Sequence, residues 1–104
     1  MKKLILILIT MLFSLTSFAE YVGGVVVVGE GGCTRRDYIV IHTNTGYVYA
    51  QEYGGSYNKG NQVVGDLNSY GFQDVLVNSS SGRLYIDGYD LSKSAVTEKC
   101  FELD

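Results

Sequence analysis

Turn-forming residues divide the chain after residue 20 into about six short runs of β-forming residues. Glycine, asparagine and serine lie between these runs, and most of the connections that they form are short. Short β runs at this spacing are typical of a small antiparallel barrel or sandwich, so the sequence predicts a mainly β fold. The expected strands are Val25–Val28, Tyr38–Thr43, Tyr47–Tyr53, Gln62–Leu67, Phe72–Val77 and Arg83–Tyr89.

The end of the chain changes period, which predicts a C-terminal α-helix after these strands. Ser92 can cap the helix, with Leu91 and Val96 in the positions of a hydrophobic staple. Val96, Cys100 and Leu103 follow at spacings of four and three residues, so they share one helix face. We expect this face to dock on the sheet.

Residues 1–19 have the composition of a cleavable export signal. Lys2 and Lys3 precede the apolar run Leu4–Phe13, and small residues surround the expected cleavage site after Ala19. The apolar run is about half of the roughly 20 residues that a membrane-spanning helix needs. We therefore expect residues 20–104 to form a single domain in the bacterial periplasm or outside the cell, without a permanent membrane anchor.

Export would place the two cysteines, Cys33 and Cys100, in an oxidising compartment, which predicts a disulfide bond between them. The bond would close a loop through most of the domain and would stabilise it by roughly 4 kcal/mol in the chain-entropy model. It would also pin the C-terminal helix to the sheet. Two cysteines and the one histidine do not complete a four-ligand zinc site, and we expect neither a metal nor a cofactor.

The charge balance and the residues available for catalysis both favour a non-enzymatic protein. Without residues 1–19, six basic residues stand against eleven acidic ones, so the net charge is −5. This charge argues against a nucleic-acid partner held by electrostatic attraction. His42 is the only histidine, and no recognisable nucleophile frame surrounds a serine. The candidates for acid–base catalysis are the carboxylates Asp66, Asp74, Asp87 and Asp90, each of which also suits a strand end or a turn.

Tyrosine is the most unusual feature of the composition, with nine residues. Most should fill the edges of the core, because tyrosine is a good strand former. Tyr47, Tyr49, Tyr53 and Tyr57 lie beside a glycine-rich loop and form the candidate binding surface. Exposure of the first three depends on the preceding hairpin. A loop of Asn44 and Thr45 would expose them, whereas a longer loop that includes Gly46 would turn them to the core.

These patterns predict an exported, non-enzymatic module that binds or inhibits a protein or an envelope glycan. One alternative is a structural subunit, in which the strand Val25–Val28 adds to the sheet of a neighbour. The second alternative is a small hydrolase that uses the acidic residues.

Overall fold

The structure, a computed structural model, describes residues 21–102, which form six β-strands and a helix. The strands are β1 (Val22–Val28), β2 (Tyr38–Thr43), β3 (Tyr47–Gly54), β4 (Gln62–Gly65), β5 (Gly71–Val77) and β6 (Ser80–Leu91), and the helix is α2 (Lys93–Phe101). The export signal predicted at residues 1–19 and the helix-face residue Leu103 lie outside the described residues.

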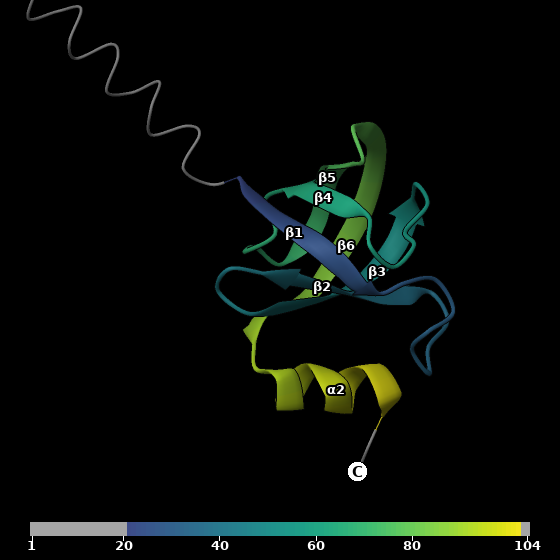
Figure 1. Cartoon of the computed structure of the whole chain (residues 1–104), viewed down its shortest axis with the longest axis vertical. Helices are drawn as coiled ribbons and strands as arrows, with labels where there is room; N and C mark the ends of the chain where they lie inside the picture. Colours follow the sequence, from purple (N-terminus) through teal and green to yellow (C-terminus); the bar gives the residue numbers. More distant parts are fainter. Residues whose placement is uncertain (1–20, 103–104) are drawn as a thin grey trace, which may run out of the picture.

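The six strands close into an antiparallel barrel in the order β1-β2-β3-β6-β5-β4. The barrel consists of two three-stranded meanders, β1-β2-β3 and β4-β5-β6, joined by the β1–β4 and β3–β6 pairs (Figure 1). This confirms the predicted mainly β fold with a C-terminal helix, and it decides between barrel and sandwich. Because the barrel is closed, every strand has a partner on each side.

In the closed barrel, β1 lies between β2 and β4. This strand contains Val25–Val28, the run predicted to add to a neighbouring sheet if the protein is a structural subunit. Residues 22–25 pair with β4, and most of β1 pairs with β2 on the other side. Val26 continues the pairing toward the loop before β4, because its N–H donates to Asn61 and its carbonyl accepts from Gly60. Val25 and Val26 are therefore hydrogen-bonded on both sides, so these two residues offer no open edge to a neighbouring sheet.

The β2–β3 hairpin adopts the register of the shorter loop. Ile41 pairs with Val48 and Ile39 with Ala50, and these four side chains are fully buried inside the barrel. Val40 and Tyr49 pair on the outer face. The loop is therefore Asn44 and Thr45, the alternative expected to expose Tyr47, Tyr49 and Tyr53, but Tyr49 is buried.

Two separate cores explain why the outer tyrosines are not all exposed. One core fills the barrel, and the second lies between the outer face of β2–β3 and α2. The second core consists of Cys33, Tyr38, Val40, Tyr49, Val96 and Cys100. In Figure 1, α2 lies outside the barrel, next to β2. Tyr49 is only 4% exposed there, and its ring stacks on that of Tyr38 with the centroids 4.5 Å apart.

The helix begins as the sequence predicts, at a serine cap. The Ser92 side chain accepts a hydrogen bond from the backbone N–H of Ala95. This bond satisfies one of the free N–H groups at the start of the helix. Val96 and Cys100 are both buried, so the predicted helix face does dock on the sheet.

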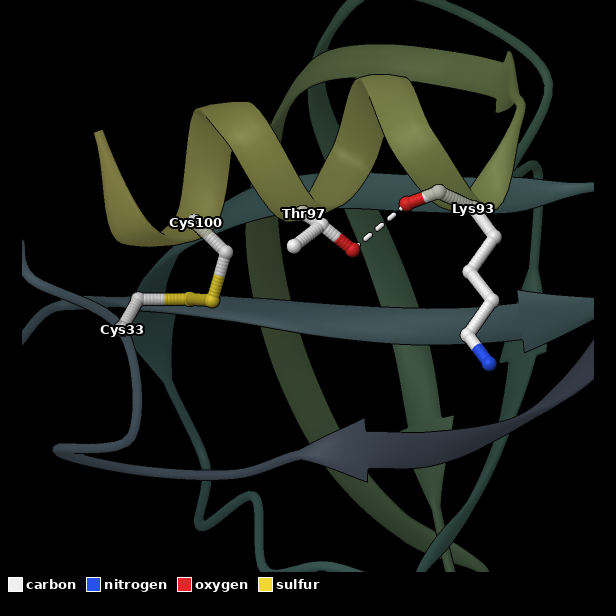
Figure 2. The surroundings of a disulfide bond; sticks show 4 residues. All are labelled: Cys33, Lys93, Thr97 and Cys100. Atoms are coloured by element: carbon white, nitrogen blue, oxygen red, sulfur yellow. Dashed lines mark hydrogen bonds between the residues drawn. A yellow bond between two sulfur atoms is a disulfide. The ribbon is translucent and has the colours of Figure 1, made fainter. Parts of the chain in front are cut away.

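Three contacts tie the end of α2 to the segment that precedes β2. The predicted disulfide joins Cys33 to Cys100, as Figure 2 shows. The Thr34 N–H donates to the Cys100 carbonyl at 2.8 Å, which satisfies one of the carbonyls left free at the helix end. The Arg35 guanidinium donates to the Glu102 carboxylate at 2.8 Å, and this pairing raises the pKa of Arg35. The helix is therefore anchored at its C-terminal end by one covalent and two polar contacts.

Removal of the disulfide should destabilise the domain strongly, because the bond closes a loop with a sequence separation of 67. We expect the double variant Cys33→Ser/Cys100→Ser to lose roughly 4 kcal/mol of unfolding free energy, measured by urea denaturation. Reductant should weaken the wild-type protein similarly and leave the double variant unchanged. A variant as stable as the oxidised wild-type protein would contradict the stabilising role of the bond.

Substitution of Tyr49 and of Tyr53 should have different effects on stability, because Tyr49 is buried and Tyr53 is exposed. Tyr49→Ala leaves a cavity under α2, so we expect a loss of about 3–5 kcal/mol in unfolding free energy. Tyr53 is 54% exposed, and Tyr53→Ala should change that free energy by only about 0.5 kcal/mol. Thermal or urea unfolding of both variants measures this difference. Equal losses would mean that α2 does not cover Tyr49 in solution.

Candidate functional site

The structure separates the four tyrosines that the sequence grouped into one binding surface. Tyr47 is half-buried beside α2 and stacks on His42, with the ring centroids 4.5 Å apart. Tyr49 is buried under the helix, where burial raises the pKa of its hydroxyl to about 12. Tyr53 alone of the four is exposed. The row Tyr47, Tyr49 and Tyr53 is therefore not a continuous exposed surface.

Tyr57 belongs to the core inside the barrel, with no exposed area. Its hydroxyl donates to the Gly54 carbonyl at 2.6 Å and lies 3.3 Å from the Arg83 carbonyl. Burial raises the pKa of this hydroxyl to about 12. Gly82 leaves room for the ring, since a Cβ there would lie 2.5 Å from the Tyr57 hydroxyl. The predicted binding role for Tyr57 does not fit this position.

A different group of aromatic side chains forms an exposed surface on the outer face of β3, β6 and β5. This aromatic patch consists of Tyr53, Phe72 and Tyr85 together with Arg83. Phe72 is 48% exposed and Tyr85 is 37% exposed. The Phe72 ring centroid lies 4.7 Å from that of Tyr53 and 4.9 Å from that of Tyr85. Three strands thus contribute rings to one apolar surface that is open to solvent.

Arg83 adds a positive charge to the aromatic patch. Its guanidinium carbon lies 4.8 Å from the Phe72 ring centroid, within the range of a cation–π contact. Its Nε lies 3.7 Å from the Asp74 carboxylate, and both side chains are exposed. An exposed ion pair of this kind contributes little to stability. The patch therefore offers aromatic area, hydroxyl groups and an oriented cation.

The rings of the patch do not form a flat platform. Tyr53 and Phe72 lie at an interplanar angle of 76°, and Phe72 and Tyr85 at 79°. Each pair therefore meets edge to face, an arrangement that aromatic quadrupoles favour. Arg83 also covers the Phe72 ring. The resulting surface is uneven, and the neighbouring ring faces do not lie in one plane.

Sequence reasoning missed Phe72 and Arg83, although a turn signal could have found them. Asn78 and Ser79 form a two-residue hairpin turn with φ angles of 48° and 72°, in which both residues are left-handed. This turn sets the pairs Phe72–Tyr85 and Asp74–Arg83. The turn expected between Val77 and Arg83 is longer, and a turn of that length does not give these pairs.

Two glutamates lie close together near Tyr57. The Glu30 carboxylate accepts a hydrogen bond from the Tyr57 N–H at 3.0 Å. Oε1 of Glu52 is buried and has no hydrogen-bond partner among the described residues. Burial, followed by the proximity of the Glu30 carboxylate, raises the pKa of Glu52 to about 7. Neither carboxylate lines the cavity of about 460 Å³ that is formed by Val27, Val28, Val40 and α2.

The four aspartates considered for acid–base catalysis each have a different partner in the fold. Asp66 accepts hydrogen bonds from Ser69, and Asp74 pairs with Arg83. Asp87 accepts from Tyr38 at 3.5 Å, and Asp90 accepts from Thr45 at 2.7 Å. Within residues 21–102, no three histidine, cysteine, aspartate or glutamate side chains gather in a group that could hold a metal ion.

Glu52 should make the stability of the domain depend on pH. Its pKa in the folded protein is about 7, above the ordinary value of 4.5, so the folded state binds the proton more tightly. Its contribution is therefore fully present below pH 4.5 and is lost as the pH rises through 7. Because Glu52 is partly exposed, we expect a loss of only about 1–2 kcal/mol over this range.

The matched variant Glu52→Gln should remove this pH dependence, because the amide carries no charge at either end of the range. Urea denaturation at pH 4.5 and at pH 8 measures the effect in both proteins. Asp74→Asn, at an exposed carboxylate, serves as the control and should keep the wild-type profile. A wild-type protein that gains stability between pH 4.5 and pH 7, relative to Glu52→Gln, would contradict the raised pKa.

Comparison with known proteins gives no match: no protein-family model, no curated protein and no solved structure matches this chain.

Proposed function

We propose that this protein is a non-enzymatic binding module that recognises another protein through the aromatic patch. The observation that carries the proposal is the exposed cluster of Tyr53, Phe72 and Tyr85 with Arg83 among them. Tyrosine, phenylalanine and arginine are the residue types enriched at protein–protein interfaces, and tyrosine and arginine are among those that dominate binding energy there.

The orientation of the rings favours a protein partner over an envelope glycan. A flat sugar chain stacks best on aromatic faces that lie side by side in one plane. Here neighbouring rings are turned by 76° and 79°, and Arg83 covers the Phe72 ring. An uneven aromatic surface with one cation suits the side chains and carboxylates of a protein partner.

The disulfide supports a location outside the cytoplasm. Disulfide bonds persist in oxidising compartments, and the domain carries one between Cys33 and Cys100. Among residues 21–102, no helix is long and apolar enough to cross a membrane. Together with the predicted signal at residues 1–19, the disulfide supports a periplasmic or secreted protein, and its partner belongs to the same compartment.

Substitution in the aromatic patch tests the proposal. We immobilise the exported protein and its Phe72→Ala/Tyr85→Ala variant, and quantify by mass spectrometry the proteins that each captures from an envelope extract. We expect at least one protein to be captured about tenfold less by the variant, as is typical when interface hot spots are removed. The unfolding free energy should change little, since both rings are exposed.

Leu76→Ala is the matched control, because Leu76 is an exposed apolar residue of β5 that lies outside the patch. It should capture the same protein as the wild type does. Equal capture by the patch variant and the wild type would contradict the proposal, and so would capture of a glycan that the patch substitutions abolish.

A further inference from the structure

A groove separate from the aromatic patch lies between α2 and the outer face of the barrel. Its volume is about 460 Å³, within the range of small-molecule sites. Three valines of the barrel, Val27, Val28 and Val40, line it together with Val96, Cys100 and Phe101 of α2. It shares no residue with the patch. The groove therefore has an apolar surface that a small ligand could contact.

The charged side chains that line this groove are both positive. Lys59 comes from the loop between β3 and β4, and Lys93 is the first residue of α2. Among residues 21–102, no carboxylate lines the groove. Neither lysine makes an ion pair with another of residues 21–102, in contrast to Arg35 and Arg83. The two ammonium groups are thus available to an anion.

The position of Lys93 is unfavourable for the helix itself. A cation in the first turn opposes the positive end of the helix dipole, and the first turn of α2 holds no acidic residue that would offset it. Figure 2 shows the side chains of Lys93, Thr97 and Cys100 leaving α2 on the side that faces the barrel. The Thr97 hydroxyl already donates to the Lys93 carbonyl at 2.6 Å. The ammonium group of Lys93 is therefore the polar group that α2 offers to a ligand in the groove.

We propose that this groove binds a free, single-chain alkyl carboxylate. The alkyl chain would lie on the valines, and the carboxylate would pair with Lys59 or Lys93. A small inorganic anion would leave the valines uncovered, and a neutral alkyl chain would leave both ammonium groups without a partner. An anionic amphiphile satisfies both parts of the groove with one molecule.

Titration calorimetry of the exported protein with alkyl carboxylates tests the proposal. We expect dodecanoate, kept below its micelle concentration, to bind at one site. Each two-carbon shortening, to decanoate and then octanoate, should weaken binding about fourfold, since the half-open groove covers only part of each methylene. Dodecyltrimethylammonium has the same chain and the opposite charge, and it should bind at least tenfold more weakly than dodecanoate.

Lysine substitutions identify the groove as the site. Lys59→Gln/Lys93→Gln should weaken dodecanoate binding about tenfold or more, while Lys99→Gln, on the same helix but outside the groove, should leave it unchanged. Thr97→Phe should weaken it too, because the larger ring occupies the space beside α2. The Phe72→Ala/Tyr85→Ala variant should bind dodecanoate normally, which separates this proposal from the proposed function.

Three outcomes would overturn the proposal. The first is the absence of dodecanoate binding to the wild-type protein. The second is binding that depends on chain length but not on the charge of the ligand or on Lys59 and Lys93, which would be non-specific apolar association. The third is binding to vesicles of anionic phospholipid without binding of monomeric dodecanoate, which would assign the lysines to a membrane surface.

Discussion

The packing of α2 against the outer face of β2 and β3 determines which side chains of these two strands are buried and where the groove lies. It buries Val40 and Tyr49, which would otherwise be exposed on the barrel wall. It also provides one side of the valine-lined groove. The aromatic patch lies on strands β3, β6 and β5, where the rings of Tyr53, Phe72 and Tyr85 remain open to solvent. One short helix thus determines which outward-facing side chains contact solvent.

Much of the fold could be predicted from the sequence, because local signals specify it. The turn residues separate the β runs, Ser92 caps the helix, and the two cysteines pair. The burial of Tyr49 was not predicted, since it depends on a helix that lies far away along the chain. One signal did exist: Tyr38–Ile41 is an unbroken apolar run with no alternation, which is typical of a strand buried on both faces. Both faces of β2 are indeed covered.

The candidate site was harder to predict, because it depends on register across three strands. Tyr53 and Tyr85 are two of the nine tyrosines in the sequence, but no local pattern predicts that they lie together. Tyr53 lies at an irregularity in the β3–β6 pairing, and its ring meets that of Phe72, which belongs to β5. Such a contact across a middle strand depends on twist and on bulges, which a single sequence does not specify.

The strand pairings of the barrel form a closed ring without α2, so the barrel and the helix need not unfold together. Residues 92–102 contribute no strand to the barrel and are therefore a candidate for a separate unit of local unfolding. Its start is held only by a cap and side-chain packing, whereas its end is covalently joined to Cys33. Amide hydrogens in the first turn of α2 should thus exchange with solvent while the barrel stays closed. After reduction of the Cys33–Cys100 bond, the last turn of α2 should open together with the first turn.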